Sequence, residues 1–257
     1  MATEFIPAER QGVIADLVKT NGVVSVAQLS LRLKVSEITI RRDLDILERR
    51  GLLERTHGGA IGIRRVNTEP LYDQKNRSER AEKVAIGKAA AALIQDGDTV
   101  LVNSGSTSLQ AILQIRGENT RIVTSNVGAV LEPPEGPELL LIGGVYRVRS
   151  NSVVGMFASL SLSQVYGTKA IIGVDGISSK YGLTTPIQQE AEIAALMIDR
   201  TRGPVIVVAD HTKIGVVSNF VTARIEKVDV LVTDSGFEEE YREELEGAGL
   251  QIIIASD

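Results

Sequence analysis

The sequence predicts a two-domain protein in which a winged helix-turn-helix unit precedes a larger Rossmann-like α/β domain. Three short helical patterns and a strand-like stretch fill the first 61 residues. From Thr99 onward, apolar strand-like runs alternate with helical ones. At 257 residues, the chain is long enough for one small and one full-sized domain. We therefore expect a helix-turn-helix unit at 1–61, a linker at 62–74 and an α/β domain at 75–257.

The first two helices are defined by their boundary residues. Pro7 can occupy a first helical turn, and Asn21-Gly22 is typical of a helix end. Between them lies an i, i+1, i+4, i+5 apolar stripe of Val13, Ile14, Leu17 and Val18. Ser25, followed by Gln28 three residues later, predicts a capping box that opens a short helix ending at Leu33.

A third helix is predicted between Ser36, a good N-cap residue, and Gly51, a left-handed stop. Ile40, Leu44 and Leu47 recur at helical spacing and form its buried stripe. This stripe turns a partly basic face outward or sideways, made of Ile38, Thr39, Arg42, Asp45 and Arg49, with Arg41 on the flank. Such a helix suits insertion into a DNA major groove, because arginine can bind guanine edges or phosphates.

Ile38 has two interpretations. It projects away from the buried stripe, so it either contacts a thymine methyl group or packs against a neighbouring helix. After Gly51 the period changes, and Leu52 to Arg55 can pair with Ala60-Ile61 around the His57-Gly58-Gly59 turn. This hairpin predicts the wing of a winged helix-turn-helix.

The charge is divided unequally along the chain. The net charge is −5, but residues 1–65 carry 11 Lys/Arg against 8 Asp/Glu and the remainder carries 17 against 25. A net charge of +3 followed by −8 fits a DNA-binding head on an acidic body.

Uninterrupted apolar runs fall short of the roughly 20 residues that span a bilayer. With no cysteine and no secretory layout at MATEFIPAER, a cytoplasmic location is expected.

The second domain is expected to begin with one long helix from Lys75 to Ile94. Predicted helices also cover Thr107 to Ile115, Gln188 to Arg200 and Glu238 to Gly247. Nearly continuous apolar strands indicate a sheet covered on both faces, with ligands at the carboxyl ends of the strands. The predicted strands are Thr99 to Asn103, Arg121 to Thr124, Leu139 to Ile142, Lys169 to Val174, Val205 to Ala209, Val228 to Thr233 and Gln251 to Ile254.

A turn rich in small hydroxylated residues, Asn103 to Ser108, follows the first strand and opens a helix. Backbone amides, hydroxyls and the helix dipole at such a turn can bind a phosphate group. A plain N-cap is the alternative interpretation. The turn lacks the GKS/T ending of a Walker loop and the spacing of a GxGxxG fingerprint.

The whole stretch VSEITIRRDLDILERRGLLERTHGGA closely resembles the N-terminal signature of the DeoR family of bacterial transcriptional regulators. The resemblance implies DNA contacts from Ser36, Thr39, Arg41 and Arg42, with Arg55 and His57 on the wing. Ile38 is added from its outward position on the helix.

The C-terminal region is similar to the DeoR sensor domain, whose fold resembles ribose-5-phosphate isomerase and the CoA-transferase group. The similarity runs in order through Ser125-Asn126, Gly143-Gly144, Asp175-Gly176, Thr184-Thr185-Pro186, Glu190, Asp210 and Lys213. It implies a sugar-phosphate site formed by Ser104, Gly105, Ser106, Thr107, Ser108, Asn126, Gly144, Asp175, Gly176, Glu190 and Lys213. Asn103 and Ser106 depart from the family, which more often has Asp and Thr there, so the sugar selectivity is open.

These landmarks also have structural interpretations. Gly143-Gly144 can simply make a turn, Asp175 can cap a loop, and Glu190 can be a solvated helix position. Lys213 is the most informative, since it can supply the charge that a sugar phosphate needs. Arg147 and Arg149 are further anion candidates, for which a surface role is also possible.

The resemblance implies a DNA-binding regulator, a repressor of a sugar-utilisation operon, controlled by a phosphorylated sugar and acting as a dimer or tetramer. The residues do not fix whether the effector releases or promotes DNA binding. The alternative is a sugar-phosphate isomerase or transferase using Asp175, Glu190 and Lys213. Two histidines, no cysteine and no metal-ligand cluster argue against an enzyme, and no cofactor or metal is expected. An architectural DNA binder would leave the α/β domain without a purpose.

Overall fold

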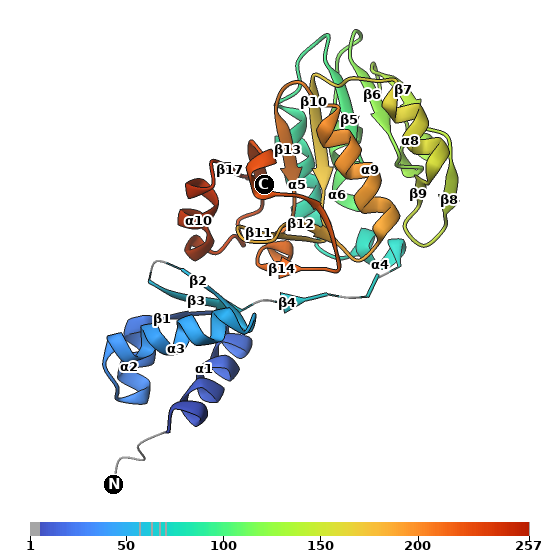
Figure 1. Ribbon diagram of the computed structural model, residues 1–257. Helices are drawn as coiled ribbons and strands as arrows, with labels where there is room; N and C mark the ends of the chain where they lie inside the picture. Colours follow the sequence, from blue (N-terminus) through green and yellow to red (C-terminus); the bar gives the residue numbers. More distant parts are fainter. Residues whose placement is uncertain (1–5, 57, 63, 67, 70, 257) are drawn as a thin grey trace. The chain divides into compact units, whose positions relative to one another are not determined.

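The structure is a computed structural model that describes residues 6–56, 58–62, 64–66, 68–69 and 71–256. The chain divides into two compact units, one ending at Arg65 and the other starting at Val66. Figure 1 shows both units, and each is described separately below. Within the described residues, no helix is both long enough and apolar enough to cross a membrane.

The N-terminal unit is a winged helix-turn-helix. Its helices are α1 (Pro7–Asn21), α2 (Val26–Leu33) and α3 (Glu37–Arg49). Strands β1 (Val23–Ser25), β3 (Gly59–Gly62) and β2 (Leu53–Arg55) form an antiparallel sheet in that order, and a two-residue strand, β4 (Arg64–Arg65), ends the unit. The predicted wing is confirmed as the β2–β3 pair. Strand β1, which the sequence analysis did not predict, pairs with β3 and is the third strand of this sheet.

The predicted helix boundaries of this unit have the expected physical causes. Ser25 and Gln28 form the capping box of α2, and the Ser36 hydroxyl accepts from the Thr39 amide at the start of α3. Gly51 has a φ of 67°, the left-handed conformation that ends a helix. The helices close on one apolar core that contains Ile14, Val18, Leu29, Leu33, Ile40, Leu44, Leu47 and Leu53.

The C-terminal unit is built on a seven-stranded parallel sheet with the order β17-β16-β13-β10-β5-β6-β7. The chain moves outward from β5 to β7, returns to place β10 on the other side of β5, and then moves outward again. The sheet therefore has a topological switch point between β5 and β10. The strands are β5 (Thr99–Val102), β6 (Arg121–Thr124), β7 (Glu138–Leu141), β10 (Lys169–Gly173), β13 (Val205–Val208), β16 (Val230–Thr233) and β17 (Gln251–Ile254).

Helices cover both faces of this sheet, as the continuous apolar strands predicted (Figure 1). On one face, α5 (Arg80–Ala91) and α6 (Ser106–Gln114) pack on Val100, Val102 and Ile171. The alternate residues Leu101 and Ile172 are equally buried toward the other face, where α9 (Gln188–Asp199) packs against β10 and α8 (Met156–Ser163) packs against α9.

The single helix predicted from Lys75 to Ile94 is wrong, because the structure has two helices there. Helix α4 (Tyr72–Arg77) ends before Ser78, whose backbone is extended, and α5 begins after Glu79, whose φ is 46°. The Lys83 ammonium binds the Lys75 and Ser78 carbonyl oxygens at 2.5 and 2.6 Å. The tertiary bonds of one buried lysine thus stabilise a break that helical periodicity does not reveal.

The remaining elements form smaller sheets and short helices. A small antiparallel sheet contains β11 (Gly176–Ser178), β12 (Gly182–Thr185) and β15 (Phe220–Ala223), and β8 (Val145–Arg147) pairs with β9 (Ser152–Val154). Short elements complete the chain: α7 (Gly128–Leu131), β14 (Val216–Val217), α10 (Arg242–Gly247) and the 3-10 turns η1 (His211–Lys213), η2 (Ile225–Lys227) and η3 (Glu239–Tyr241). The predicted helix at Glu238 to Gly247 is therefore a 3-10 turn followed by a shorter α-helix.

Candidate functional site

The outward face of α3 presents the side chains that the sequence analysis expected there. Ile38 is 67% exposed, so it does not pack against a neighbouring helix, and the second of its two interpretations is wrong. Ser36 and Thr39 stand at the start of the helix, with their hydroxyl oxygens 2.9 Å apart. The start of α3 therefore offers an apolar side chain and two hydroxyls to a partner surface.

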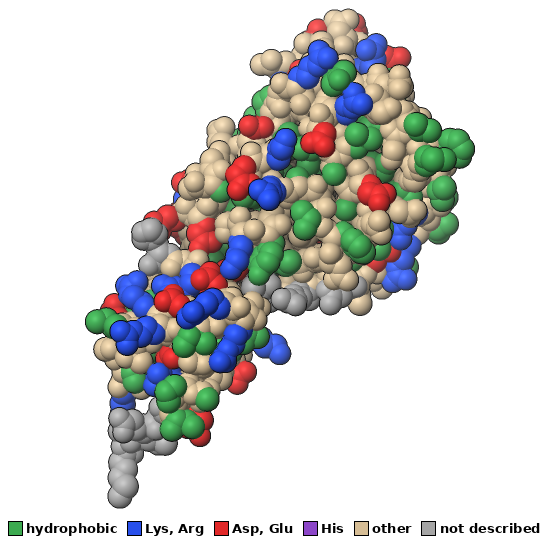
Figure 2. Space-filling view, in the orientation of Figure 1, with side chains coloured by type: hydrophobic (Ala, Val, Ile, Leu, Met, Phe, Trp, Pro, Cys, Tyr) green, Lys and Arg blue, Asp and Glu red, His purple; other side chains and the backbone are tan. Residues whose placement is uncertain are grey.

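The two arginines of this face differ in their partners. Arg41 lies 3.7 Å from the carboxylate of Glu37, one turn earlier. Arg42 is exposed, and within the described part of the chain its guanidinium makes neither an ion pair nor a hydrogen bond. Figure 2 shows Lys and Arg side chains gathered over the visible face of this unit. Arg42 is therefore ready to bind a base edge or a phosphate.

Arg55 on the wing strand β2 is already engaged. Its guanidinium donates to the Arg41 carbonyl oxygen at 3.0 Å and forms an ion pair with Asp45. The Arg55 amide also donates to the Glu48 carboxylate at 3.3 Å. Arg55 thus braces the wing against α3. His57, the other predicted wing contact, lies outside the described residues.

A buried polar cluster fixes the direction of α3, and the sequence analysis missed it. The Asp43 carboxylate accepts from Arg10 at 2.5 Å and from Gln11 at 3.0 Å, both on α1. Asp43 is only 3% exposed. A carboxylate next to the apolar stripe was the available signal, since buried charges are normally paired.

A pocket opens at the carboxyl ends of β5 and β10, the switch point of the parallel sheet. Its lining includes most of the predicted effector residues: Ser104, Gly105, Ser106, Thr107, Ser108, Asp175, Glu190 and Lys213. Tyr72 and Lys75 of α4, Ser78 directly after it and Lys83 of α5 also line it. The topology thus brings together side chains that are more than 100 positions apart in the sequence.

The loop after β5 is held in shape by its neighbours. Gly105 has a φ of 137°, which favours glycine, and its carbonyl oxygen accepts from Asn126 at 2.9 Å. Asn126 is fully buried behind the loop and does not line the pocket. The loop leads directly into α6, so the first amides of that helix point toward the pocket.

Asn103, where the resembling family more often has Asp, ties two strands together. Its amide nitrogen donates to the Gly173 carbonyl oxygen at 2.8 Å, and its amide oxygen accepts from the Gly173 amide at 2.7 Å. The same oxygen accepts from Ser108 at 2.9 Å. An aspartate could not donate the first bond. A Cβ at Gly173 would lie 2.4 Å from the Ser108 hydroxyl oxygen, so a larger residue there would displace the hydroxyl that donates to Asn103.

Three lysines give the pocket its positive charge. Lys213 lines it from η1, and its ammonium has no ion pair or hydrogen bond within the described residues. Lys75 forms an ion pair with Asp175, and Lys83 is 4% exposed. Burial lowers the pKa of Lys83, and the charges of Lys213 and Lys75 act in the same direction, while Asp210 and Glu79 oppose them. Cations that repel one another favour an anion among them.

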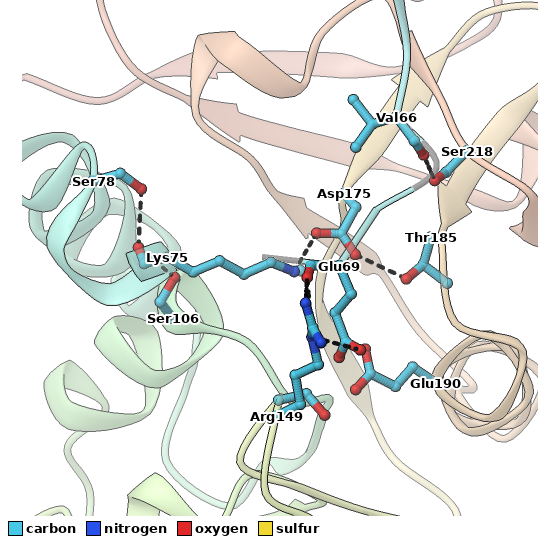
Figure 3. Close-up of polar contacts among 12 residues, drawn as sticks. Val66, Glu69, Lys75, Ser78, Ser106, Arg149, Asp175, Thr185, Glu190 and Ser218 are labelled. Carbon is cyan, nitrogen blue, oxygen red and sulfur yellow. Dashed lines mark hydrogen bonds and ion pairs between the residues drawn. The ribbon is translucent and has the colours of Figure 1, made fainter. Parts of the chain in front are cut away.

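Two carboxylates also line the pocket. Asp175 accepts from Thr185 at 2.8 Å in addition to its ion pair with Lys75 (Figure 3). Glu190 accepts from Arg147 at 2.9 Å and from Ser152 at 3.1 Å. Each carboxylate is therefore fixed in place, where it can accept hydrogen bonds from hydroxyl groups of a polyhydroxylated ligand.

Arg147 and Arg149, the additional anion candidates, bind a carboxylate of the protein instead. Arg147 makes a two-pronged pair with Glu69 at 2.9 and 3.0 Å, and Arg149 donates to the Glu69 carbonyl oxygen at 2.6 Å. Hydrogen bonding to Glu69 raises the pKa of Arg147, and the charge of Glu190 adds to this effect. Neither arginine lines the pocket.

Two predicted glycines also lie away from the pocket lining. A Cβ at Gly144 would meet Val153 and Val154 of the neighbouring hairpin strand, and one at Gly176 would meet the Val216 carbonyl. Both therefore allow backbone segments to approach closely. Lys75 and Lys83 were missed because the sequence analysis placed them inside a continuous helix, and Tyr72 because it was placed in the linker.

Comparisons with known proteins agree with this architecture. A family model described as the DeoR-like helix-turn-helix domain matches residues 10–66. A second, described as the DeoR C-terminal sensor domain, matches residues 78–235. The sensor model alone covers more than half of the chain.

Curated relatives match nearly end to end. The chain is 34% identical to the transcriptional regulator GlpR of Haloferax volcanii, over 97% of this chain and 98% of that one. It is 31% identical to the repressor GlcR of Bacillus subtilis, over 96% and 95%, and 31% identical to the lactose phosphotransferase system repressor of Lactococcus lactis, over 90% and 92%. These relatives are named regulators or repressors and not enzymes, so the chain is a transcriptional regulator and the isomerase or transferase alternative is set aside.

Among solved structures, the chain is similar to ribose 5-phosphate isomerase A from Methanocaldococcus jannaschii. The TM-score is 0.38 at 15% identity, over 53% of this chain and 55% of that one. A likeness of this strength supports no conclusion about function.

Proposed function

The chain belongs to the DeoR family of transcriptional regulators, and on that premise we propose that it represses a sugar-utilisation operon under the control of a phosphorylated sugar. Names of relatives that refer to repression, and in one case to a lactose phosphotransferase system, support this proposal. We propose the cytoplasm as its place of action, because its proposed partner is DNA. The observation that carries the effector proposal is the cationic pocket at the sheet's switch point.

The pocket suits a phosphate ester of a sugar. The Ser104 to Ser108 loop supplies hydroxyls and the first amides of α6, and Lys213 supplies a positive charge with no competing protein partner among the described residues. Asp175 and Glu190, which line the same pocket, can accept from sugar hydroxyls. A site that combines cations, hydroxyls and carboxylates favours a ligand with an anionic head and a polar, uncharged body.

The DNA partner would be read by α3. We assign major-groove contacts to the exposed face that bears Ser36, Ile38, Thr39, Arg41 and Arg42. Ile38 is suited to a thymine methyl group and Arg42 to a guanine edge or a phosphate. His57 stays a predicted wing contact, and Arg55 contributes by fixing the wing.

A thermal-shift panel tests the effector proposal. Full-length protein is heated with ribose 5-phosphate, fructose 1-phosphate, fructose 6-phosphate or glucose 6-phosphate, and with each free sugar as its control. A ligand that binds only the folded state stabilises it, by about 2.7 kcal/mol at 100 times its Kd. We expect at least one phosphate to raise the Tm while its free sugar does not. Equal shifts from phosphate and free sugar, or no shift from any phosphate, would contradict the proposal.

We also propose that the regulator is a homo-oligomer, a dimer or a tetramer. An apolar face on α8 and the β8 hairpin supports this: Val145, Tyr146, Val148, Met156, Phe157 and Leu160 are each more than half exposed. Figure 2 shows hydrophobic side chains gathered over this region. Monomeric proteins rarely expose large contiguous apolar patches.

Light scattering of the Phe157→Asp variant tests this surface. We expect the parent to be oligomeric and the variant to have a lower average mass, because a carboxylate in an apolar contact loses hydration without gaining a partner. Val221→Asp, at a 61% exposed apolar position on β15, is the control and should leave the mass unchanged. A monomeric parent, or an unchanged mass for Phe157→Asp, would reject the apolar face as the interface.

A further inference from the structure

Helix α4 lies between the DNA-binding unit and the sensor sheet in the sequence, and it forms part of the pocket wall. Tyr72 and Lys75 of α4 and Ser78, directly after it, line the pocket. Val66, the first residue of the C-terminal unit, lies six positions before Tyr72, where α4 begins. A change in the contacts that hold α4 therefore changes how the segment leading to the DNA-binding unit is anchored.

The contacts that hold α4 come from the pocket itself. The Lys75 ammonium is paired with Asp175. The Lys75 carbonyl oxygen accepts from Lys83 at 2.5 Å and from the Ser106 hydroxyl at 3.3 Å. Figure 3 shows Lys75 extending between the loop that carries Ser106 and the Asp175 carboxylate. Both ends of one α4 residue are thus bound by groups of the proposed effector site.

The segment before α4 is tied to the same domain at two further points. The Val66 amide donates to the Val217 carbonyl oxygen at 3.1 Å, and the Val66 carbonyl oxygen accepts from the Ser218 hydroxyl. Glu69 is held by Arg149 at its carbonyl oxygen and by Arg147 at its carboxylate. These contacts of Glu69 with Arg147 and Arg149 are called the Glu69 tie below. Arg147 also donates to Glu190, which lines the pocket, so the Glu69 tie is linked to the site through Arg147.

A phosphate group in the loop would compete for the groups that hold α4. The Ser106 hydroxyl has one proton, so donating it to a phosphate oxygen gives up the bond to the Lys75 carbonyl. A phosphate dianion also competes with Asp175 for the Lys75 ammonium, while Asp175 keeps its bond from Thr185. A bound phosphate and the contacts that hold α4 therefore compete for the same donors, the Ser106 hydroxyl and the Lys75 ammonium.

We propose that α4 and the Glu69 tie couple the effector pocket to the DNA-binding unit, with Lys75 and Ser106 changing partners when a phosphate ester binds. This inference rests on the proposed function, because it names the route by which a bound sugar phosphate changes operator affinity. Lys75 and Ser106 are the exchanging groups, and the contact between Arg149 and Glu69 passes the change along the chain.

The test removes the Arg149 contact with Glu69 and leaves the pocket lining and the Arg147 pair with Glu69 in place. Arg149→Ala deletes a guanidinium that is 55% exposed and does not line the site. Arg121→Ala is the matched control, since Arg121 is 51% exposed and paired with Glu138 elsewhere on the same domain. Full-length proteins are titrated with an operator duplex selected from a random-sequence library, with and without the sugar phosphate that gives the largest thermal shift.

We expect the parent's operator Kd to change by about fivefold or more on adding the sugar phosphate. In Arg149→Ala that ratio should fall toward one, whereas the sugar-phosphate Kd, measured calorimetrically, stays within about twofold of the parent's. Arg121→Ala should keep the parent's ratio. If Arg149→Ala keeps the parent's ratio of operator Kd values with and without the sugar phosphate, the inference is overturned and the proposed function stays intact.

Hydrogen exchange supplies a second, local readout. The Lys75 amide is bonded to the Leu71 carbonyl oxygen and the Ser78 amide to that of Gln74. Saturating full-length protein with the same sugar phosphate should change the exchange rates of these amides. Unchanged rates at saturation would overturn the inference independently. A parent whose operator Kd does not respond to any sugar phosphate would reject the proposed function, and the inference with it.

Discussion

At the residue scale, whether a charged side chain is already paired within the protein decides whether it can bind DNA or a ligand. Arg42 and Lys213 both have no protein partner among the described residues, whereas Arg55, Arg147 and Lys75 are already paired. A residue type read from the sequence does not reveal this difference, because the partner is brought in by the fold. Asn103 shows the same limit, since its bonds to Gly173 span 70 positions.

Replacing Arg42 by Ala should weaken specific operator binding by about 1 to 3 kcal/mol, because a guanidinium on a base edge discriminates by that amount. Arg49→Ala is the control: Arg49 is exposed on the last turn of the same helix and bonded to the Asp45 carbonyl oxygen. Fluorescence anisotropy with operator and scrambled duplexes measures both. An equal loss on both duplexes with a shallower salt dependence would make Arg42 a phosphate contact instead.

Replacing Lys213 by Ala should leave operator affinity unchanged in the absence of sugar phosphate but abolish the response to it. The reason is that Lys213 lines the pocket of the C-terminal unit and carries an uncompensated charge among the described residues. Lys227→Ala, an exposed lysine of the same unit, should respond like the parent. A normal response from Lys213→Ala would remove Lys213 from the effector site.

At the element scale, local patterns predicted most helices and strands but missed features that depend on distant contacts. Helix α3 begins after Ser36, as its N-cap indicated, and the wing strands pair around the predicted turn. The break between α4 and α5 was missed because Lys83 stabilises it by binding carbonyl oxygens five and eight residues earlier. Strand β1 was missed because three residues give no periodicity.

The position of α3 should depend on its buried carboxylate. Asp43→Ala leaves the Arg10 guanidinium without its carboxylate partner in a buried site, which we expect to destabilise the N-terminal unit by about 3 to 5 kcal/mol. Asp45→Ala removes a carboxylate that is 54% exposed on the same helix and should cost about 1 kcal/mol or less. Native-state hydrogen exchange of α3 amides in the full-length protein measures both. Equal losses in the two variants would contradict the assigned role of Asp43.

At the scale of the whole molecule, the order of the strands explains where the site lies. All seven predicted strands belong to one parallel sheet, and continuous apolar runs were sufficient to indicate burial on both faces. The reversal of strand order between β5 and β10 was not visible in the sequence, yet it places Ser104 to Ser108 beside Asp175. The resemblance to a family predicted that these residues share a site, while local pattern alone could not.

We propose that this protein contains an operator reader and a sugar-phosphate sensor that are thermodynamically coupled. The most direct test is the operator Kd of the full-length protein, measured by fluorescence anisotropy with and without a saturating sugar phosphate and with its free sugar as control. The account predicts that the phosphate changes the operator Kd by about 5- to 150-fold and that the free sugar leaves it unchanged. An operator Kd that stays the same while the sugar phosphate is demonstrably bound would contradict it.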